Sequence, residues 1–180
     1  MPTSSQELHM HVLMKKAEMS DVEIVSSILS EAALYLESIE QPLWKCDELM
    51  PGKISDDIGR GEYYIAYHDG EPVGTLKYQL EDKLFWPEIP EGTSGFVHRV
   101  AIRRRVASKG VSRQMLEWAK EHTREIERQY LRLDCAIRPK LCNVYERNGF
   151  TEDSERQVGP YLVARYICNV QTCEQSEPGR

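Results

Sequence analysis

Residues 97–112, VHRVAIRRRVASKGVS, combine types and spacing that suit a site for a charged small molecule. A β-branched run leads into a basic loop, and a helical pattern begins at Val111. Backbone N–H groups of this loop would converge with a helix N-terminus, an arrangement that binds phosphate or pyrophosphate. Lys109 and the run Arg103–Arg105 add positive charge. The alternative is an ordinary strand-to-helix turn with a solvated basic cluster.

Residues 131–150, LRLDCAIRPKLCNVYERNGF, continue the pattern with a second strand and a second helix. Taken in order, the strand ending in VAI, KGV at a helix start, the strand LRLDC and the helix ending in YERNGF resemble the core of the GNAT superfamily of acyl-CoA-dependent N-acyltransferases. The resemblance is strong over residues 96–150. It implies an N-acetyltransferase that moves an acetyl group from acetyl-CoA, the acyl-donor cosubstrate, to an amine by direct attack in a ternary complex.

The resemblance also implies a coenzyme site. The family loop pattern Q/R-x-x-G-x-G/A holds the coenzyme A pyrophosphate, and Ala107, Gly110 and Ser112 occupy its three defining positions. Only Gly110 matches fully, but backbone amides do not depend on side-chain identity. The family strand before this loop pairs with the pantetheine arm through main-chain groups. The cofactor-binding residues so implied are Val100, Ala101, Ile102, Ala107, Ser108, Lys109, Gly110, Val111 and Ser112.

Tyr145 occupies the position from which family members commonly protonate the departing thiolate. A thiol with a pKa of about 8 to 9 is a mediocre leaving group until it receives a proton, so a nearby hydroxyl has a clear role. The alternative is a packed helix aromatic. Seven residues earlier, Arg138 replaces an Asn that many relatives carry, so coenzyme contacts from that position are not implied here.

The amine must lose a proton before it attacks, which calls for a general base. Relatives often supply a Glu at the position of Phe96, which cannot accept a proton. His98, two residues later, would share a face with Val100 and Ile102 by strand alternation, and we expect its pKa near 6 to 7. A structural histidine is the alternative. Three carboxylates are further candidates: Asp134, Glu88 and Glu91.

Other residues that could do chemistry carry weaker patterns. The five Cys residues include no C-x-x-C pair, and nothing completes a metal site with His9 and His11, so no metal is expected. Phe85 and Trp86 lie in a proline-bounded loop, residues 81–95, where we expect them to be exposed for substrate or partner contact.

The elements that must position these residues follow from periodicity and turn signals. Ser20 is expected to cap a helix that starts at about Asp21, with Glu23 as its capping-box partner. Asp69-Gly70 predicts a hairpin turn, and Pro139 a helix start. The expected buried stripe of the first helix is Ile24, Ile28, Ala32, Leu36 and Ile39.

The resulting order is β-α-α-β-β-β-α-β-α-β-β. It predicts an α/β (α+β) fold with a mixed, mostly antiparallel sheet, a central parallel βαβ unit and helices on both faces, as in the GNAT fold. We expect one domain over residues 10–170, between a flexible N-terminus (1–9) and a flexible tail (171–180).

Composition limits the function classes. The 180 residues include 23 Lys and Arg against 29 Asp and Glu, a formal net charge of -6, which disfavours nucleic acid as a partner. Stretches without Asp, Glu, Lys or Arg reach only eight residues, well below the roughly 20 of a membrane span. We therefore expect a cytoplasmic protein without membrane association that acts on a small-molecule or peptide amine, with a homodimer as a further option. A non-catalytic acyl-CoA-binding or interaction module of the same fold is the alternative function.

Overall fold

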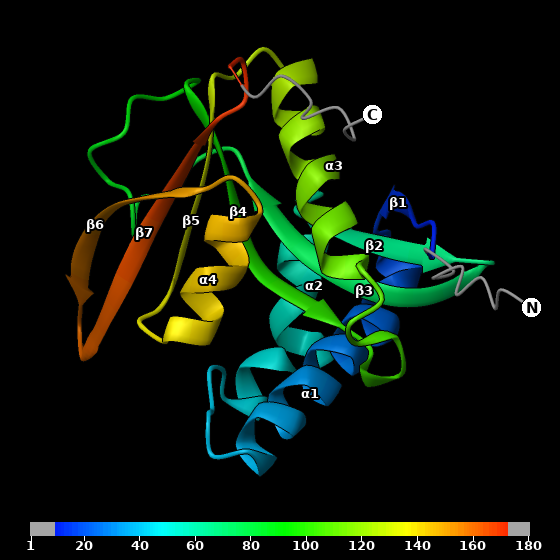
Figure 1. Ribbon diagram of the computed structural model, residues 1–180. Coiled ribbons are helices and arrows are strands. Elements are labelled where there is room, and N and C mark those ends of the chain that lie inside the picture. The colour runs from blue at the N-terminus through cyan, green and yellow to red at the C-terminus, as the bar shows by residue number, and fades with distance from the viewer. Residues whose placement is uncertain (1–9, 173–180) are drawn as a thin grey trace, which may run out of the picture.

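The computed structural model describes residues 10–172, and Figure 1 shows their arrangement. The flexible ends predicted for residues 1–9 and 171–180 lie outside the described residues, apart from Gln171 and Thr172. The described part forms one sheet with helices on both faces. None of its helices has the length and apolar character that crossing a membrane requires.

The sheet is mixed and mostly antiparallel, as predicted. Its seven described strands pair in the order β1-β2-β3-β4-β5-β7-β6. Only β4 and β5 run parallel, and the helix α3 connects them in the predicted βαβ unit. The strands are β1 (Leu13–Lys16), β2 (Tyr63–His68), β3 (Glu71–Gln79), β4 (Ser94–Ile102), β5 (Tyr130–Ala136), β6 (Thr151–Val158) and β7 (Tyr161–Asn169).

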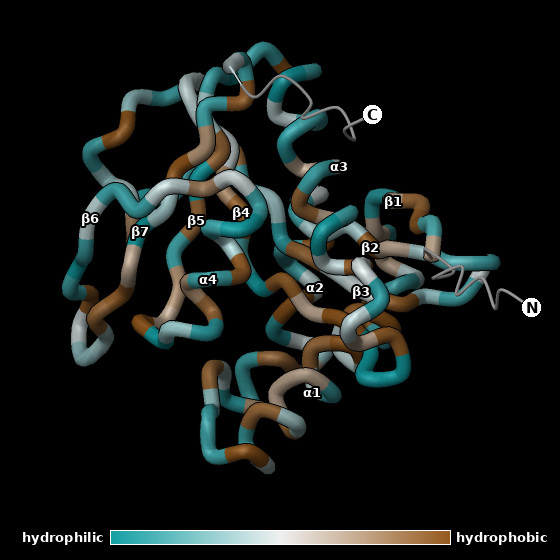
Figure 2. Tube along the Cα trace, in the orientation of Figure 1, coloured by the Kyte–Doolittle hydropathy of each residue, from teal (hydrophilic) through white to brown (hydrophobic). Residues whose placement is uncertain are grey.

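Two pairs of helices cover the two faces of the sheet. They are α1 (Val22–Ser38) and α2 (Pro51–Gly59) on one face, and α3 (Val111–Glu125) and α4 (Pro139–Arg147) on the other. Strand alternation supplies both cores, because Tyr63 and Ile65 pack with α1 and α2 whereas Tyr64 and Ala66 pack toward α3. Figure 2 shows hydrophobic residues recurring along α1 and the central strands.

The start of α1 differs from the prediction. A 3-10 turn, η1 (Met19–Asp21), precedes the helix, and the Glu18 N–H donates to the Asp21 carboxylate at 2.9 Å. Ser20 is therefore not the N-cap, because the capping box lies between Glu18 and Asp21. The buried stripe agrees with the predicted one at Ile28, and Ile24 and Ala32 pack partly buried against the same core, but packing against the sheet and α2 selects other residues as its fully buried members. The buried apolar residues of α1 are Val25, Ile28, Leu29 and Ala33.

The predicted turn and helix-start signals are confirmed where backbone geometry demands them. Asp69 and Gly70 both have positive φ, 49° and 79°, and join β2 to β3. Pro139 lies in the first turn of α4, where its missing N–H leaves no hydrogen bond unmade.

The irregularity that shapes the site lies in β4. Its register with β3 shifts between Thr75 and Lys77, and the bulge on β4 contains Arg99 with a left-handed φ of 51°. The pairing of β4 with β5 ends at Val97, so residues 98–102 have one edge that β5 does not cover. Figure 1 shows the two strands separating beyond their paired end.

Candidate active site

A cavity of about 990 Å³ lies where β4 and β5 separate. Segments far apart in the sequence line it: the stretch between α1 and α2 (residues 43–48), the loop after β3, α4 and the turn between β6 and β7. Aromatic side chains of Trp44, Phe85 and Tyr161 contribute to its walls. The cavity therefore combines apolar walls with the charged groups described next.

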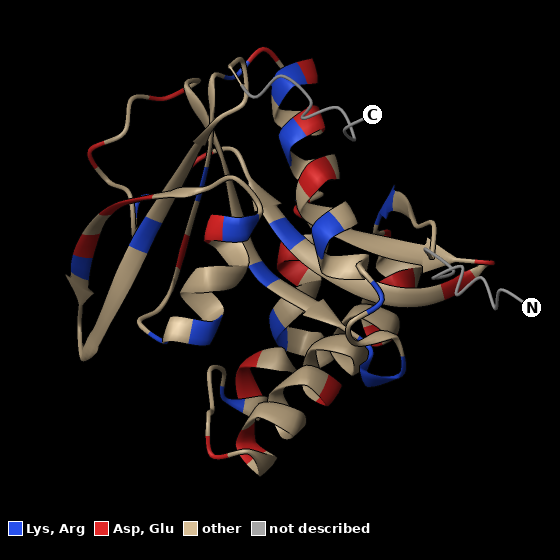
Figure 3. Ribbon diagram, in the orientation of Figure 1, with Lys and Arg blue, Asp and Glu red and all other residues tan. Residues whose placement is uncertain are grey.

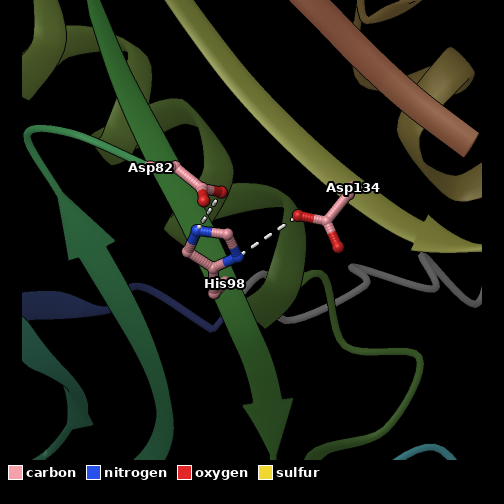
Figure 4. Close-up of side chains that lie close together, drawn as sticks. All are labelled: Asp82, His98 and Asp134. Atoms are coloured by element: carbon pink, nitrogen blue, oxygen red, sulfur yellow. Dashed lines mark ion pairs between the residues drawn. The ribbon is translucent and has the colours of Figure 1, made fainter. Parts of the chain in front are cut away.

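His98 lies between two carboxylates at this cavity (Figure 4). Its Nε2 is 3.2 Å from Asp82 Oδ2, and its Nδ1 is 3.3 Å from Asp134 Oδ1. The three side chains come from β4, from the loop after β3 and from β5. Asp82 Oδ2, His98 Nε2 and Asp134 Oδ1 are buried and have no other hydrogen-bond partner among the described residues, so the imidazole and the carboxylates depend on one another.

This environment overturns the expected pKa of His98. Burial lowers the pKa, but Asp134 and Asp82 outweigh burial and raise it from 6.5 to about 9. Burial raises the pKa of Asp82, whereas His98 and the N–H groups of Phe85 and Leu84 lower it below its usual value overall. The imidazole is therefore protonated at neutral pH, and the predicted pKa near 6 to 7 is wrong because the contacts of His98 with Asp134 and Asp82 were not foreseen.

The predicted alternation of His98 with Val100 and Ile102 is also wrong. Val100 and Ile102 pack against the core on the α3 side, whereas Ala101 belongs to the core under α1 and α2. The bulge at Arg99 inserts an extra residue into β4, and this reverses the alternation after His98. His98 and Val100 therefore lie on opposite faces, although both reach the cavity at the opening of the sheet.

The other candidate bases differ in whether they lie at the cavity. Asp134 is part of the cluster, but the remaining two carboxylates are not among the cavity residues. Glu88 pairs with Arg165, and Glu91 pairs with Lys83 at 3.1 Å.

The donor set of the cluster resembles a metal site in composition, because a His and two Asp side chains offer atoms within 4.8 Å of one another. The geometry favours a clamp on the imidazole instead. The carboxylates face different ring nitrogens, so an ion bound to one nitrogen of His98 would lie beside one carboxylate only.

Tyr145 projects from α4 and lines the same cavity. Its hydroxyl forms no hydrogen bond with any described residue, and its ring contacts are with Phe150 and Tyr166 at 6.2 Å between centroids. Burial raises the pKa of Tyr145, and Cys135 and Asp134 reinforce the effect. The hydroxyl therefore keeps its proton at neutral pH.

The predicted coenzyme loop leads from β4 through the 3-10 turn η3 (Arg104–Val106) to α3. Ser108 and Gly110 take left-handed φ values of 62° and 76°. The N–H groups of Gly110 and of residues 111–113 donate to no described residue, so they are available at the positive end of the helix dipole. These amides and the uncovered edge of residues 100–102 lie on consecutive segments of the chain.

The basic run in this loop is partly neutralised within the protein. Arg103 pairs with Glu31 at 2.8 Å, and the Arg104 guanidinium lies 3.5 Å from the centroid of the Tyr35 ring. Figure 3 shows the positive residues in the segment before α3. Arg138, at the start of α4, donates to the carbonyls of residues 41 and 42, both at 2.7 Å, and so joins α4 to the segment after α1.

Only one of the two aromatic residues predicted to be exposed in the loop after β3 reaches the cavity. Phe85 lies 6.3 Å from His98 between ring centroids and lines the cavity. Trp86 is only 1% exposed, because it packs between the guanidinium groups of Arg132 and Arg165 at 4.9 and 4.4 Å from its ring. The predicted exposure of Trp86 is therefore wrong.

Sequence reasoning missed Asp82 and Arg99 as cavity residues. Asp82 belongs to no recognisable sequence motif, and its approach to His98 depends on how the loop after β3 folds back over the sheet. Arg99 would point to the other face in a regular strand, and only the bulge turns it toward the cavity.

Comparisons with known proteins agree with this geometry. The family described as "Acetyltransferase (GNAT) family" matches residues 32–150. An uncharacterized N-acetyltransferase, YesJ of Bacillus subtilis (strain 168), is 28% identical over 156 residues, which cover 82% of this chain and 86% of YesJ.

Solved structures share the fold. A GNAT-family acetyltransferase from Listeria monocytogenes superposes with a TM-score of 0.73 at 19% identity, covering 88% of this chain and 94% of that chain. The PaiA N-acetyltransferase from Thermoplasma acidophilum, solved in complex with coenzyme A, gives a TM-score of 0.68 at 15% identity over 89% of this chain and 99% of that chain. With the sequence match spanning most of the sheet and the strand separation in place, this chain belongs to the GNAT family of acetyltransferases.

Proposed function

We propose that this protein transfers the acetyl group of acetyl-CoA to an amine by direct attack in a ternary complex. The observation that carries the proposal is the uncovered edge of β4. It begins beside His98 and leads through residues 100–102 and the following loop to the free N–H groups of α3. An extended ligand with a pyrophosphate at one end and a thioester at the other fits that sequence of groups.

In this proposal the pyrophosphate binds at residues 108–112, where the N–H groups of Gly110, Val111 and Ser112 donate to no described residue and lie at the helix N-terminus. The pantetheine arm pairs with the main chain of Val100, Ala101 and Ile102, as an added strand would. Lys109 contributes charge from the loop. Side chains at Ala107, Val111 and Ser112 need only be compatible with close approach of the phosphates.

The chemistry follows from the groups in the cavity. The amine nitrogen attacks the thioester carbonyl, and main-chain donors of β4 stabilise the negative charge on its oxygen. The neutral form of His98 accepts the proton that the nitrogen releases, and the carbon–sulfur bond breaks as Tyr145 protonates the thiolate. The products are the acetylated amine and coenzyme A, with one proton taken up by His98 and one given by Tyr145.

The raised pKa of His98 determines the pH dependence of this mechanism. With a pKa of about 9, only about 1% of the imidazole is neutral at pH 7. The rate should therefore climb with pH until about 9. Asp82 and Asp134 act as positioning residues that hold the ring and set its basicity.

The test is thiol release from acetyl-CoA across a panel of amines, together with calorimetric binding of acetyl-CoA. Turnover with an amine, lost in His98→Gln while coenzyme binding is retained, would support the proposal. Tight binding of acetyl-CoA without turnover of any amine would instead favour a non-catalytic acyl-CoA-binding module.

A further inference from the structure

Arg99 lies at the bulge of β4 directly after His98, and both side chains line the same cavity. Neighbouring residues of a regular strand point to opposite faces. The left-handed backbone of Arg99, with φ of 51°, breaks that alternation, and a residue with a β-carbon adopts this region at a free-energy cost. The strained backbone thus brings a guanidinium group to the side of the cavity where His98 lies.

The charge of Arg99 has no counter-ion in the described part of the chain. The half-buried guanidinium donates from Nη1 to the Tyr63 hydroxyl at 3.2 Å and forms no ion pair with a described residue. Lys77 on the neighbouring strand, by contrast, pairs with Asp57 at 2.7 Å. An arginine keeps its charge and offers five N–H donors, and a partly buried cation without a partner is unfavourable. The site therefore suits an anion brought by a ligand.

The cluster of His98, Asp82 and Asp134 carries the opposite charge. Two carboxylates, Asp82 and Asp134, flank one imidazole, so the cluster keeps a net negative charge when the imidazole is protonated. The anionic cluster around His98 and the cationic Arg99, the next residue of β4, thus face one cavity. An α-amino acid carries the matching pair, because its ammonium and carboxylate groups are attached to the same carbon.

We propose that the acetyl acceptor is a free α-amino acid and that Arg99 binds its carboxylate in a bidentate pair. The inference rests on the proposed function, because it names the acceptor of that reaction. The amino group then lies toward His98, where it loses its proton. Amines without this carboxylate, including a protein N-terminus whose α-carbonyl is in a peptide bond, leave Arg99 unpaired.

The experiment compares trios of acceptors in the thiol-release assay. Each trio holds an amino acid, its carboxamide and the amine left after decarboxylation, and the trios span apolar, polar, acidic and basic side chains. The wild-type protein is compared with Arg99→Gln and Arg99→Lys. Lys83→Gln is the matched control, because Lys83 is a 60% exposed cation at the same cavity that pairs with Glu91. Thermal unfolding and acetyl-CoA calorimetry verify that each variant is folded.

We expect at least one amino acid to react with a higher kcat/KM than its carboxamide and its decarboxylated amine. Arg99→Gln should lower kcat/KM for that amino acid by about 10- to 100-fold, mainly through KM, because a charge-assisted pair is lost. The same variant should change the carboxamide little. Arg99→Lys should keep part of the preference, and Lys83→Gln should keep all of it.

Turnover of amines with no amino acid favoured over its carboxamide would overturn the inference and leave the proposed function intact. An equal loss for amino acid and carboxamide in Arg99→Gln would also overturn it, since that pattern indicates a structural role. If Arg99→Gln fails to fold, the inference is tested by the acceptor preference of the wild-type protein and by its change in Arg99→Lys. No turnover with any acceptor would count against the proposed function, and the inference would fall with it.

Discussion

Replacing Asp82 with Asn should move the pH–rate profile toward neutral pH. Asp82 Oδ1 accepts hydrogen bonds from the N–H groups of Leu84 and Phe85, at 3.0 and 2.9 Å, and Oδ2 faces His98. Asn retains an oxygen for the two N–H groups and removes only the negative charge beside the imidazole. The substitution therefore tests the electrostatic effect with the turn preserved.

The magnitude follows from the distances. An opposite charge this close typically raises the pKa of a histidine by about 1 to 3 units, and both Asp82 and Asp134 act on His98. Loss of one should bring the pKa from about 9 to about 8 or below. The neutral fraction at pH 7 then rises from about 1% to about 10% or more, which more than offsets the weaker basicity of the ring.

The assay is kcat/KM for thiol release between pH 5.5 and 10.5 with one acceptor, alongside NMR titration of the His98 ring protons. Using one acceptor cancels the titration of the amine itself. Glu88→Gln is the matched control, because it removes a carboxylate from the same loop that pairs with Arg165 rather than with His98. If the rising part of the pH–rate profile is unchanged in Asp82→Asn, or if wild-type His98 titrates near pH 6.5, the reasoning is refuted.

Three further predictions follow from the same geometry. Tyr145→Phe keeps the ring and removes the proton donor, so kcat should fall about 100-fold while calorimetry shows an unchanged acetyl-CoA affinity. Full turnover in this variant would mean that water supplies the proton. Gly110→Val should weaken acetyl-CoA binding at least about tenfold, because φ is 76° and the new side chain obstructs the phosphates. Gly92→Val, at φ 79° outside the proposed coenzyme loop, controls for backbone strain. If the two variants bind acetyl-CoA with equal affinity, that result argues against the site. Because the folded-state pKa of His98 is raised, its contribution to the free energy of unfolding, about 3 kcal/mol, should be fully present below pH 6.5 and lost as pH rises through about 9. Denaturant unfolding of wild type and His98→Gln at several pH values measures this contribution. If the free energies of unfolding of the two proteins change in parallel with pH, the prediction is contradicted.

The order of helices and strands could be predicted from the amino-acid sequence, because the signals for these elements are local. Asp69-Gly70 can adopt the two left-handed residues of a tight hairpin, and Pro139 suits a helix start. The same holds for the proposed coenzyme loop, where Gly110 and the helix that follows expose N–H groups regardless of distant residues. The family resemblance lies likewise in consecutive segments, those of residues 96–150.

The chemistry of the cavity could not be predicted in this way, because it depends on contacts between segments that are far apart in the sequence. Asp82 reaches His98 because the loop after β3 folds over the sheet, and no spacing in the chain encodes that contact. Arg99 faces the cavity because β4 bulges against β3, which reverses an alternation that the sequence pattern predicts to be regular. The pKa of His98 and the polarity of the site depend on distances between segments, and a sequence pattern contains residue types but not those distances.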